Sequence, residues 1–261
     1  MRKRKVNPMS KLPLISLFLA VTVLTYPAGA SDTDSHFEVE AGVINTHNFE
    51  LHGYQQPSAT ADFTQSAPDL RLEYWRTQPQ SWNYGLVAQP LSVNYSGSLS
   101  APLTYKGKTY EAGEEARVKF QFPTVRGTAN YPVFIGHDPD SYVRIGGSLI
   151  VRYANIDFQT PSGSFKSVNW IGLPLFNVET STPLSEHYRV FTRSDFLPSV
   201  DGNTLLDGLF DVSVGLRRQI NKDSSLDLGV RLFFGGYDPK KVDDYASRIF
   251  YDAIVLRYSF R

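Results

Sequence analysis

The sequence contains no cysteine, and its 26 basic residues match its 26 acidic residues, so the formal net charge is zero. Without cysteine the chain forms no disulfide, offers no thiol as nucleophile or metal ligand, and cannot carry the lipid of a bacterial lipoprotein. A basic surface for nucleic acid is missing, so no nucleic-acid partner is expected. After residue 31 no apolar run approaches the roughly 20 residues of a membrane-spanning helix, and no helical periodicity of useful length is present.

The first 30 residues have the composition of a secretory signal peptide. Arg2-Lys3-Arg4-Lys5 precedes an apolar run from Leu12 to Tyr26, and Ala28-Gly29-Ala30 supplies a small-x-small cleavage site. We therefore predict a cleaved signal peptide over residues 1–30 and one mature domain over 31–261. The leader holds five basic residues, so 21 basic residues against 26 acidic ones leave the mature chain at about −5.

The mature chain alternates apolar and polar residues at period two, which is typical of strands with one apolar face. The pattern is strictest in residues 210–217, 226–232 and 254–260. An apolar face fits either the interior of a soluble barrel or the exterior of a membrane barrel. We predict ten strands near residues 36–46, 68–77, 81–95, 116–126, 141–156, 165–178, 187–197, 208–220, 225–236 and 249–260. Eight strands are the alternative, because Pro90, Pro123, Pro132 and Pro174 are disfavoured inside central strands.

The connectors between these strands are alternately short and long, apart from the short Pro161-Ser162-Gly163. The last strand carries apolar or aromatic residues at alternate positions, Ile254, Leu256, Tyr258 and Phe260, before a final Arg261. In this architecture and terminal strand the chain resembles the single-chain outer-membrane β-barrel proteins of Gram-negative bacteria.

The resemblance implies an all-β fold, a transmembrane antiparallel up-and-down β-barrel in the cell outer membrane, with short periplasmic turns and long extracellular loops. It also implies contact with outer-membrane lipid and lipopolysaccharide. Ile254, Leu256, Tyr258 and Phe260 would then be the insertion signal that the barrel-assembly machinery reads, and Arg261 departs from that pattern by one residue.

Taken literally, the alternation directs charged residues of both signs into the lumen, with arginine in excess. These predicted lumen-lining residues are Glu38, Glu40, Arg71, Glu73, Arg117, Lys119, Arg144, Arg152, Arg189, Arg193, Asp195, Asp211, Arg217, Asp227, Arg231 and Arg257. The same reading turns Val118, Phe120 and Phe122 toward lipid. Side chains just fill a barrel of about eight strands. The lumen is therefore either a plug of arginine–carboxylate pairs or a narrow, anion-preferring pathway for small solutes.

No catalytic, metal or cofactor site is indicated. Ser185-Glu186-His187 is the one place where a hydroxyl, a base and an acid adjoin, but neighbouring strand residues point to opposite faces. The leading hypothesis is a non-enzymatic, porin-like protein of the cell envelope that has a structural role or passes small solutes. A surface protein that contacts host, phage or lipopolysaccharide through loops 47–67 and 96–115 is the alternative. A lipid-modifying enzyme or protease is the third.

Overall fold

The computed structural model describes residues 34–53, 59–61, 66–105, 107–136, 141–197, 208–237 and 245–261. The predicted signal peptide lies outside these residues. Ten long antiparallel strands form a sheet that closes on itself, because the last strand pairs with the first. The prediction of ten strands is confirmed, and the alternative of eight is wrong. No helix in the described part of the chain is long and apolar enough to cross a membrane.

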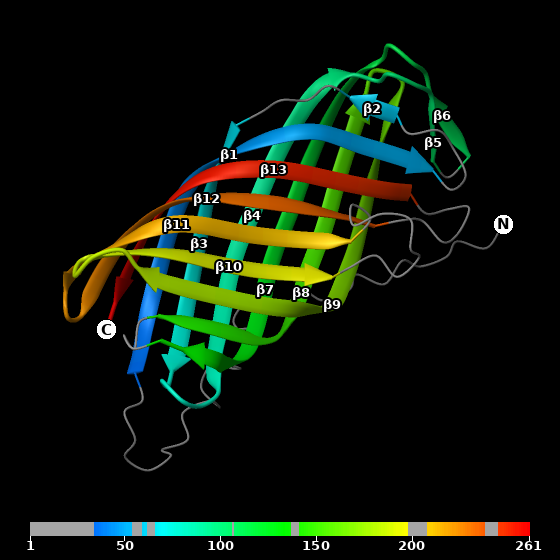
Figure 1. Cartoon of the computed structure of the whole chain (residues 1–261). Helices are drawn as coiled ribbons and strands as arrows, with labels where there is room; N and C mark the ends of the chain where they lie inside the picture. The colour runs from blue at the N-terminus through cyan, green and yellow to red at the C-terminus, as the bar shows by residue number, and fades with distance from the viewer. Residues whose placement is uncertain are drawn as a thin grey trace. The chain divides into compact units, whose positions relative to one another are not determined.

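Each long strand pairs with its neighbour in sequence, so the barrel is an up-and-down meander (Figure 1). The strands are β1 (Asp34–Gly53), β3 (Ser66–Thr77), β4 (Asn83–Ser98), β7 (Glu115–Ile135), β8 (Tyr142–Thr160), β9 (Gly163–Pro183), β10 (Tyr188–Leu197), β11 (Leu209–Asn221), β12 (Ser224–Tyr237) and β13 (Tyr245–Phe260). The short β2 (Ala59–Ala61) pairs with β1, and β5 (Leu103–Tyr105) with β6 (Lys108–Tyr110) forms a separate hairpin.

The two ends of the barrel differ in their connections. Residues 78–82, 136–141, 184–187 and 222–223 join strands at the end where β1 starts and β13 finishes, and we call this the turn end. There Arg261 Nη2 lies 2.6 Å from Asp34 Oδ2. The opposite, loop end carries the connections 54–65, 99–114, 198–208 and 238–244 and the tight turn 161–162. Outer-membrane barrels have periplasmic turns and extracellular loops, which puts the turn end in the periplasm.

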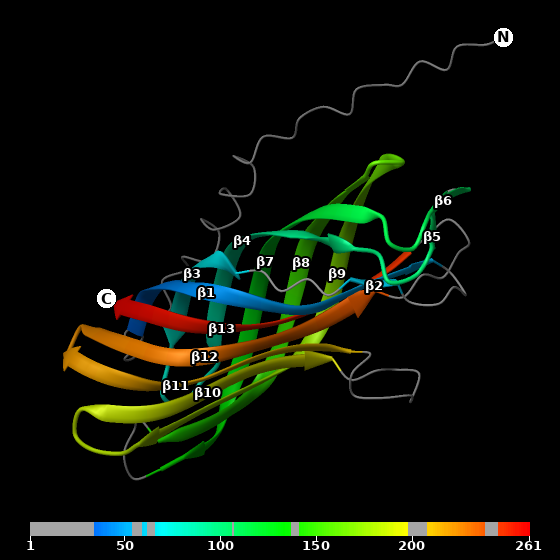
Figure 2. The same ribbon diagram turned by 90° about the horizontal axis from the view of Figure 1, so that it is seen from above.

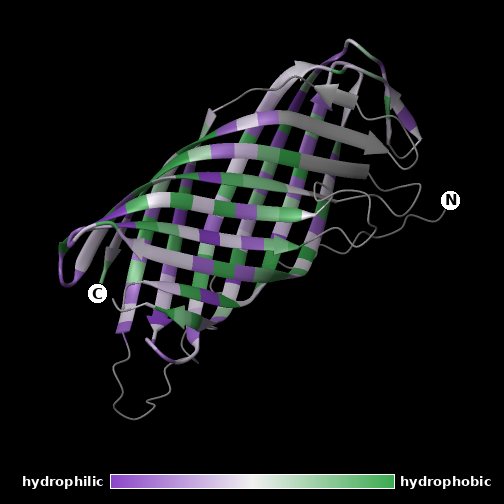
Figure 3. Cartoon of the chain, viewed as in Figure 1, coloured by the Kyte–Doolittle hydropathy of each residue, from purple (hydrophilic) through white to green (hydrophobic). Residues whose placement is uncertain are grey.

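The outer wall presents an apolar belt, and hydrophobic and hydrophilic residues alternate along the strands (Figure 3). Exposed members of the belt are Val39, Val43, Leu70, Leu72, Ile145, Leu149, Val151, Val214, Leu216, Leu228, Val230, Leu232, Ile254 and Leu256. Aromatic rings cluster on the same face near the turn end, where Phe37 lies 5.1 Å from Tyr74 and Trp82 lies 5.6 Å from Tyr131 between ring centroids. Rings at this level are the interfacial girdle of a membrane barrel.

The strands β4, β7, β8 and β9 lie side by side and form one wall, the long-strand wall (Figure 2). In this wall the side that carries the apolar residues changes from the outer face to the inner face toward the loop end. On β7 the side chains of Val118, Phe120 and Phe122 are buried in the interior, whereas Arg117 and Lys119 are exposed on the outside. The prediction had both sets reversed. Beyond the lipid the outer face meets water, so apolar side chains turn inward as in a soluble barrel.

Two prolines coincide with breaks in the hydrogen-bond ladder. Pro90 on β4 lies directly opposite Pro123 on β7. Two residues that face each other in an antiparallel pair exchange either two backbone hydrogen bonds or none. Because proline has no N–H, Pro90 and Pro123 exchange none. Their nitrogen atoms therefore point away from each other, toward the neighbouring strands β3 and β8. The β3–β4 ladder accordingly ends at Leu72 and Ala88, and the β7–β8 ladder skips Phe122 and Pro123.

The other two prolines are accommodated differently. Pro132 adjoins a register shift between β7 and β8, which is a bulge. Pro174 lies on the outer face of β9, opposite Leu149 of β8. All four prolines are therefore compatible with ten continuous strands.

Candidate functional site: the filled interior

The turn-end half of the interior holds a network of ion pairs contributed by nearly every strand. Eight carboxylates and eight arginines point inward, and all of them except Arg152 take part in ion pairs: Glu38, Glu40, Asp69, Glu73, Glu179, Asp195, Asp211 and Asp227, with Arg71, Arg126, Arg144, Arg152, Arg193, Arg217, Arg231 and Arg257. Because the two sets are equal in number, the charges of this layer balance. Buried charges persist where they are paired and hydrogen-bonded.

Asp211 lies at the centre of the network. It accepts hydrogen bonds from Arg231 Nε at 2.6 Å and Arg231 Nη2 at 2.8 Å, and a third from Arg126 Nη1 at 2.9 Å. Arg126 also contacts Asp195 Oδ2 at 2.6 Å, and Arg231 reaches Asp69 Oδ2 at 3.3 Å. Bidentate arginine–carboxylate pairs are among the stronger charge-assisted hydrogen bonds, so these contacts tie β11 and β12 to β7, β10 and β3.

Nearer the turn end, arginines and carboxylates alternate on neighbouring strands. Arg217 Nε and Nη2 each donate to Asp227 at 2.8 Å, and Arg257 Nε and Nη2 donate to Glu40 Oε2 at 3.0 and 2.5 Å. These four residues are consecutive in one cross-strand row, since Arg217 faces Asp227, Asp227 faces Arg257, and Arg257 faces Glu40. The row extends to Arg71 of β3, which faces Glu40 on its other side.

Two carboxylates face each other directly in this layer, Glu38 on β1 and Glu73 on β3. Arg193 lies between them, with Nη1 at 2.6 Å from Glu73 Oε2 and 3.4 Å from Glu38 Oε2. Its guanidinium stacks 4.6 Å from the Trp75 ring centroid, and Trp75 Nε1 donates to Glu73 at 2.8 Å. Trp75 in turn covers Gly85, where a Cβ atom would lie 2.5 Å from the indole ring.

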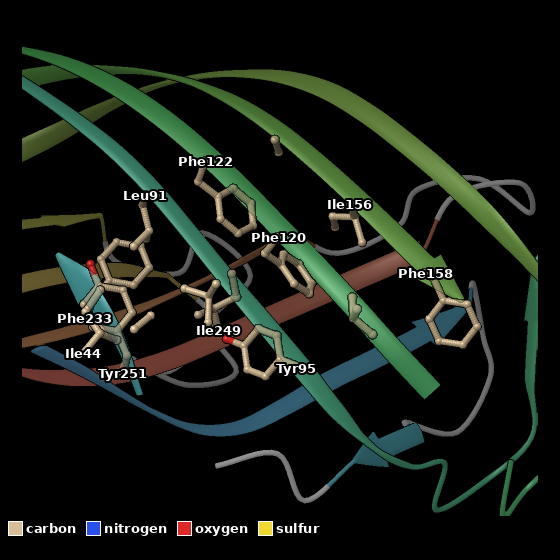
Figure 4. Close-up of a cluster of buried hydrophobic side chains, with 14 of the residues drawn as sticks. Ile44, Leu91, Tyr95, Phe120, Phe122, Ile156, Phe158, Phe233, Ile249 and Tyr251 are labelled. Carbon is tan, nitrogen blue, oxygen red and sulfur yellow. The ribbon is translucent and has the colours of Figure 1, made fainter. Parts of the chain in front are cut away.

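Toward the loop end an apolar layer fills the interior, as the close-up in Figure 4 shows. Phe233 and Tyr251 stack at 4.9 Å between ring centroids, and Tyr95 packs edge-on against Phe120 at 5.4 Å. Phe120 is completely buried. The interior therefore consists of an ionic layer nearer the turn end and an apolar layer nearer the loop end.

Arg152 lies where the two layers meet. Its guanidinium is 4.9 Å from the ring centroid of Phe233 and 5.7 Å from that of Phe122, and its Nε donates to Thr124 Oγ1 at 3.1 Å. It makes no ion pair with any residue that the structure describes. Cation–π contacts of this kind are favourable when the cation is desolvated.

The β5–β6 hairpin packs onto the apolar layer at the loop end. Leu103 and Tyr110 are 1 % exposed, and the Tyr110 ring lies 5.1 Å from that of Phe158. Lys108 Nζ donates to the carbonyl oxygen of Ser162 in the β8–β9 turn at 2.5 Å. These contacts hold the hairpin against the loop end of the long-strand wall.

Glu114, which follows this hairpin, makes a second link to the β8–β9 turn. Its Oε2 accepts a hydrogen bond from Ser162 Oγ at 2.7 Å, and its Oε1 accepts one from the Glu111 N–H at 2.8 Å. These donors, Ser162 first, lower the pKa of Glu114 to about 2. The Glu114 side chain is half-exposed at the surface, so the link is a local fastening of the loop end.

Two adjoining cavities of about 40 and 140 Å³ open at the turn end. They share the lining residues His36, Thr77, Tyr142, Arg144, Ser181 and Arg217. Arg189, Lys222 and Arg261 line the larger one, together with Asp34 and Asp223. This turn-end mouth is richer in cations than the balanced layer above it.

The structure places most of the predicted lumen residues inside. Twelve belong to the ion-pair network: Glu38, Glu40, Arg71, Glu73, Arg144, Arg193, Asp195, Asp211, Arg217, Asp227, Arg231 and Arg257. Arg152 lies between aromatic rings, and Arg189 lines the turn-end mouth. Arg117 and Lys119 are on the outer face, which corrects the prediction.

Sequence reasoning missed three interior charges, Asp69, Arg126 and Glu179, which are 3, 4 and 4 % exposed. Arg126 and Arg117 have opposite parity on one strand, so no regular strand directs both inward. The choice of Arg117 excluded the residue that bridges Asp195 and Asp211. The signal that could have identified Arg126 is the alternation around it. Its neighbours Val125 and Gly127 are uncharged and suit the lipid-facing side, so Arg126 between them points inward.

The histidines do not assemble a catalytic site in the described part of the chain. Ser185, Glu186 and His187 are all exposed in the β9–β10 turn. A pair that sequence reasoning did not single out, His47 Nε2 and Asp252 Oδ1, makes a short contact on the outer wall of β1 and β13. The nearby Ser66 hydroxyl donates to Asn45 at 3.1 Å, so this hydroxyl is not placed as a nucleophile for the pair.

Metal ligands are likewise not grouped. Among the described residues, no cluster of three or more His, Cys, Asp or Glu side chains could hold a metal ion. The predicted insertion signal, Ile254, Leu256, Tyr258 and Phe260, lies on the lipid-facing side of β13, where its four side chains are 60, 49, 43 and 37 % exposed. Its recognition by the assembly machinery stays a prediction.

The fold is similar to solved outer-membrane barrels. The outer membrane protease OmpT from Escherichia coli superposes with a TM-score of 0.59 at 9 % identity, over 90 % of this chain and 99 % of that one. The translocator domain of the autotransporter NalP from Neisseria meningitidis gives 0.43 at 10 % identity and 94 % of both chains. The Neisserial surface protein A gives 0.34 at 10 % identity, over 88 % and 99 %.

No protein-family model and no curated protein matches the sequence. The likeness to OmpT shows the fold. The apolar belt with its aromatic girdle indicates that the outer wall meets lipid. The chain therefore has the fold of the Gram-negative outer-membrane β-barrel proteins, a closed ten-stranded barrel whose apolar outer belt meets the lipid of the outer membrane.

Proposed function

We propose that the protein is a non-enzymatic scaffold of the outer membrane, with a sealed lumen and a rigid wall that it displays at the cell surface. The observation that carries the proposal is the filling of the interior by two stacked layers, one of balanced ion pairs and one of packed aromatic and aliphatic side chains. A barrel filled in this way gains stiffness, and its surfaces, not its lumen, are available for function.

A narrow anion pathway finds less support in the same contacts. Arg217, Arg231 and Arg257 would have to line such a path, yet each donates at least two hydrogen bonds to a carboxylate. An anion that entered the ionic layer from the turn end would compete with the carboxylates for these arginines. Farther toward the loop end it would meet the apolar layer. Wide aqueous lumens belong to barrels of about 16 to 18 strands.

A role at the surface is favoured by the construction of the loop end. β7, β8 and β9 continue beyond the apolar belt, and the β5–β6 hairpin is fastened to them by Lys108 and Glu114. A catalytic role has less support, since Ser185, Glu186 and His187 are all exposed in the β9–β10 turn and the Ser66 hydroxyl near His47 donates to Asn45. The similarity to a protease extends to the fold and not to an assembled site.

The proposal is tested by solute flux through vesicles that contain the refolded mature protein. With chloride-sensitive dye inside, we expect the influx to equal that of protein-free vesicles, while a 16-stranded porin in parallel vesicles gives rapid influx. Sustained chloride entry through the folded barrel would contradict a sealed lumen. A second experiment deletes residues 103–110 and uses this variant to complement a knockout strain. If the protein has a display function, we expect the cell-surface phenotype to be lost while the barrel still folds.

A further inference from the structure

The strand β9 continues past the end of its neighbour β10 at the loop end (Figure 1). It pairs with β8 from Gly163 to Ser181, but its pairing with β10 stops at Phe176, which faces Phe196. No segment that the structure describes forms a backbone hydrogen bond to the β10 side of residues 163–175. We call this stretch the β9 edge, because it is the open edge of a sheet.

Pro174 shows which backbone groups the β9 edge presents. It faces Leu149 of β8 in an unbroken register and has no N–H. Two residues that face each other in an antiparallel pair exchange two backbone hydrogen bonds or none, so this pair exchanges none and the backbone of Pro174 points away from β8. Every second residue toward the β8–β9 turn shares this orientation, so its N–H and C=O groups are open to a further strand. These residues are Gly172, Trp170, Val168, Lys166 and Ser164.

The β9 edge lies beyond the lipid. An unpaired sheet edge does not occur within the hydrocarbon of a bilayer, because its backbone groups would lack hydrogen-bond partners. The last rung of the closed barrel on this side belongs to an aromatic row, in which Phe176 lies 5.7 Å from Phe196 and Phe196 lies 5.9 Å from Phe210 between ring centroids. Aromatic rings at the end of an apolar belt mark the headgroup level. The β9 edge therefore begins where the membrane ends and faces the extracellular solution.

Apolar and charged side chains adjoin the open backbone. On the outer face Trp170 is 70 % and Val168 is 45 % exposed. Lys166 is also exposed and makes no ion pair with a residue that the structure describes. It lies in one cross-strand row with Asp157 of β8 and Lys119 of β7, so the row carries two cations and one carboxylate. An uncovered tryptophan beside unpaired backbone groups and an excess of positive charge is suited to a protein partner.

We propose that an extended, acidic segment of a partner protein adds to the β9 edge as a further β-strand. In this binding mode backbone hydrogen bonds supply affinity, and alternate side chains supply specificity. The outward side chains of the added strand place a carboxylate beside Lys166 and cover Val168 and Trp170. Its inward side chains lie next to Ile171 and Leu173, which are apolar and half-buried against the core. The partner segment therefore alternates acidic outward residues with apolar inward ones.

A second copy of this chain is a poorer occupant of the β9 edge. Lysine on an exposed edge is one of the features by which natural sheets avoid pairing between identical edges. Two β9 edges would bring the positive rows of both barrels together, whereas an acidic strand neutralises the row.

The inference rests on the surface role proposed above and does not depend on the sealed lumen. A barrel that passes chloride and binds the acidic strand would refute the sealed lumen and leave this site in place. A sealed barrel that does not bind the strand would do the reverse. The two failures are therefore distinguishable.

The test titrates the folded barrel in detergent micelles into a dye-labelled nine-residue peptide and follows its fluorescence anisotropy. The probe alternates glutamate and valine, begins and ends with glutamate, and matches the roughly 30 Å from Ser164 to Gly172. A second peptide has lysine in place of glutamate. Two more carry N-methyl groups, one on the glutamates and one on the valines. Residues that oppose Lys166 share its backbone orientation, so only the glutamate N–H groups face β9, and valine methylation is the matched control.

The barrel variants are Lys166→Glu, which reverses one charge, and Val168→Pro, which removes one donor from the β9 edge. Proline is tolerated in an edge strand when its N–H side faces solvent. Lys222→Glu at the turn end is the control for charge. Migration of unheated samples on gels confirms that each variant is folded, and hydrogen exchange of single amides locates the bound peptide.

We expect the acidic peptide and its valine-methylated form to bind, and the basic and glutamate-methylated peptides to bind more weakly by about tenfold or more. Lys166→Glu should weaken binding of the acidic peptide about fivefold and Val168→Pro about tenfold, while Lys222→Glu leaves it unchanged. The Val168 and Trp170 amides should exchange rapidly in the free barrel and slowly in the bound one, whereas the Ile171 amide, bonded to β8, is slow in both.

Equal binding of the two methylated peptides, or of the acidic and basic peptides, would overturn the proposal. So would wild-type affinity in the folded Val168→Pro variant. Slow exchange of the Val168 and Trp170 amides in the free barrel would also overturn it. Such protection would show that the edge is already paired within the chain or, if it depends on protein concentration, with a second copy.

Discussion

Replacing Asp211 by alanine should destabilise the barrel more than any change on its outer wall. The substitution removes three hydrogen bonds and leaves Arg231 and Arg126 in the interior without their shared carboxylate. Breaking a buried ion pair by removing one partner costs about 3–5 kcal/mol. Because Arg126 keeps Asp195 and Arg231 keeps Asp69, we expect the lower end, about 3 kcal/mol, or roughly a hundredfold in the unfolding equilibrium.

The assay is reversible urea unfolding of the protein in lipid vesicles, followed by tryptophan fluorescence. The control is Arg218→Ala, an exposed outward residue on the same strand, for which a change within about 0.5 kcal/mol is expected. Adding Arg231→Met to Asp211→Ala should recover part of the loss, because it removes the uncompensated charge. A single variant within about 1 kcal/mol of wild type, or a second substitution that adds to the loss, would refute the idea of a coupled buried network.

Two further predictions follow from local geometry. Gly85→Val should cost about 1–3 kcal/mol of unfolding free energy in the same urea assay, because its Cβ would meet the Trp75 ring at 2.5 Å. The control Gly127→Val should cost less, because a Cβ at this outer-face position has nothing within 4 Å. Equal losses in the two variants would show that the indole does not occupy that position. The contact of Glu114 with Ser162 should be complete above pH 4.5, the ordinary pKa of the carboxyl, and should be lost as the pH falls toward 2, since the folded pKa is depressed. Hydrogen exchange of the peptide 100–114, corrected for intrinsic rates, should then rise in the wild type and be flat with pH in Glu114→Gln; a flat wild-type profile would contradict the assignment.

The period-two pattern identified the strands and which residues share a face, but it did not state which face meets lipid at each height. In β11 to β13 the apolar side is outward throughout the regular pattern, so Asp211, Arg231 and Arg257 were directed inward correctly. On β7 the strand is 21 residues long and leaves the membrane midway. There the sense of the alternation reverses, and a single assignment for the whole strand placed Arg117 and Lys119 inside.

The partners within the interior could not be predicted for a different reason. Arg193 and Glu73 are 120 residues apart in sequence, and their contact depends on how the closed barrel sets opposite walls across the lumen. Local periodicity contains no information on strand register, which the whole sheet fixes together. The same limit hid the His47–Asp252 pair, whose members lie on the first and last strands.

Single-channel recording in a planar bilayer tests the central claim, a sealed lumen, most directly. The refolded mature protein is compared with an Arg217→Glu, Arg231→Glu variant, which replaces two arginines of the ionic layer by carboxylates and removes the bidentate partners of Asp227 and Asp211. We predict that the wild type is silent while demonstrably folded, and that the variant either unfolds or gives irregular openings as like charges separate the layer. Discrete wild-type openings with an anion preference that the variant loses would show that the arginines line a conducting path, and would contradict the claim.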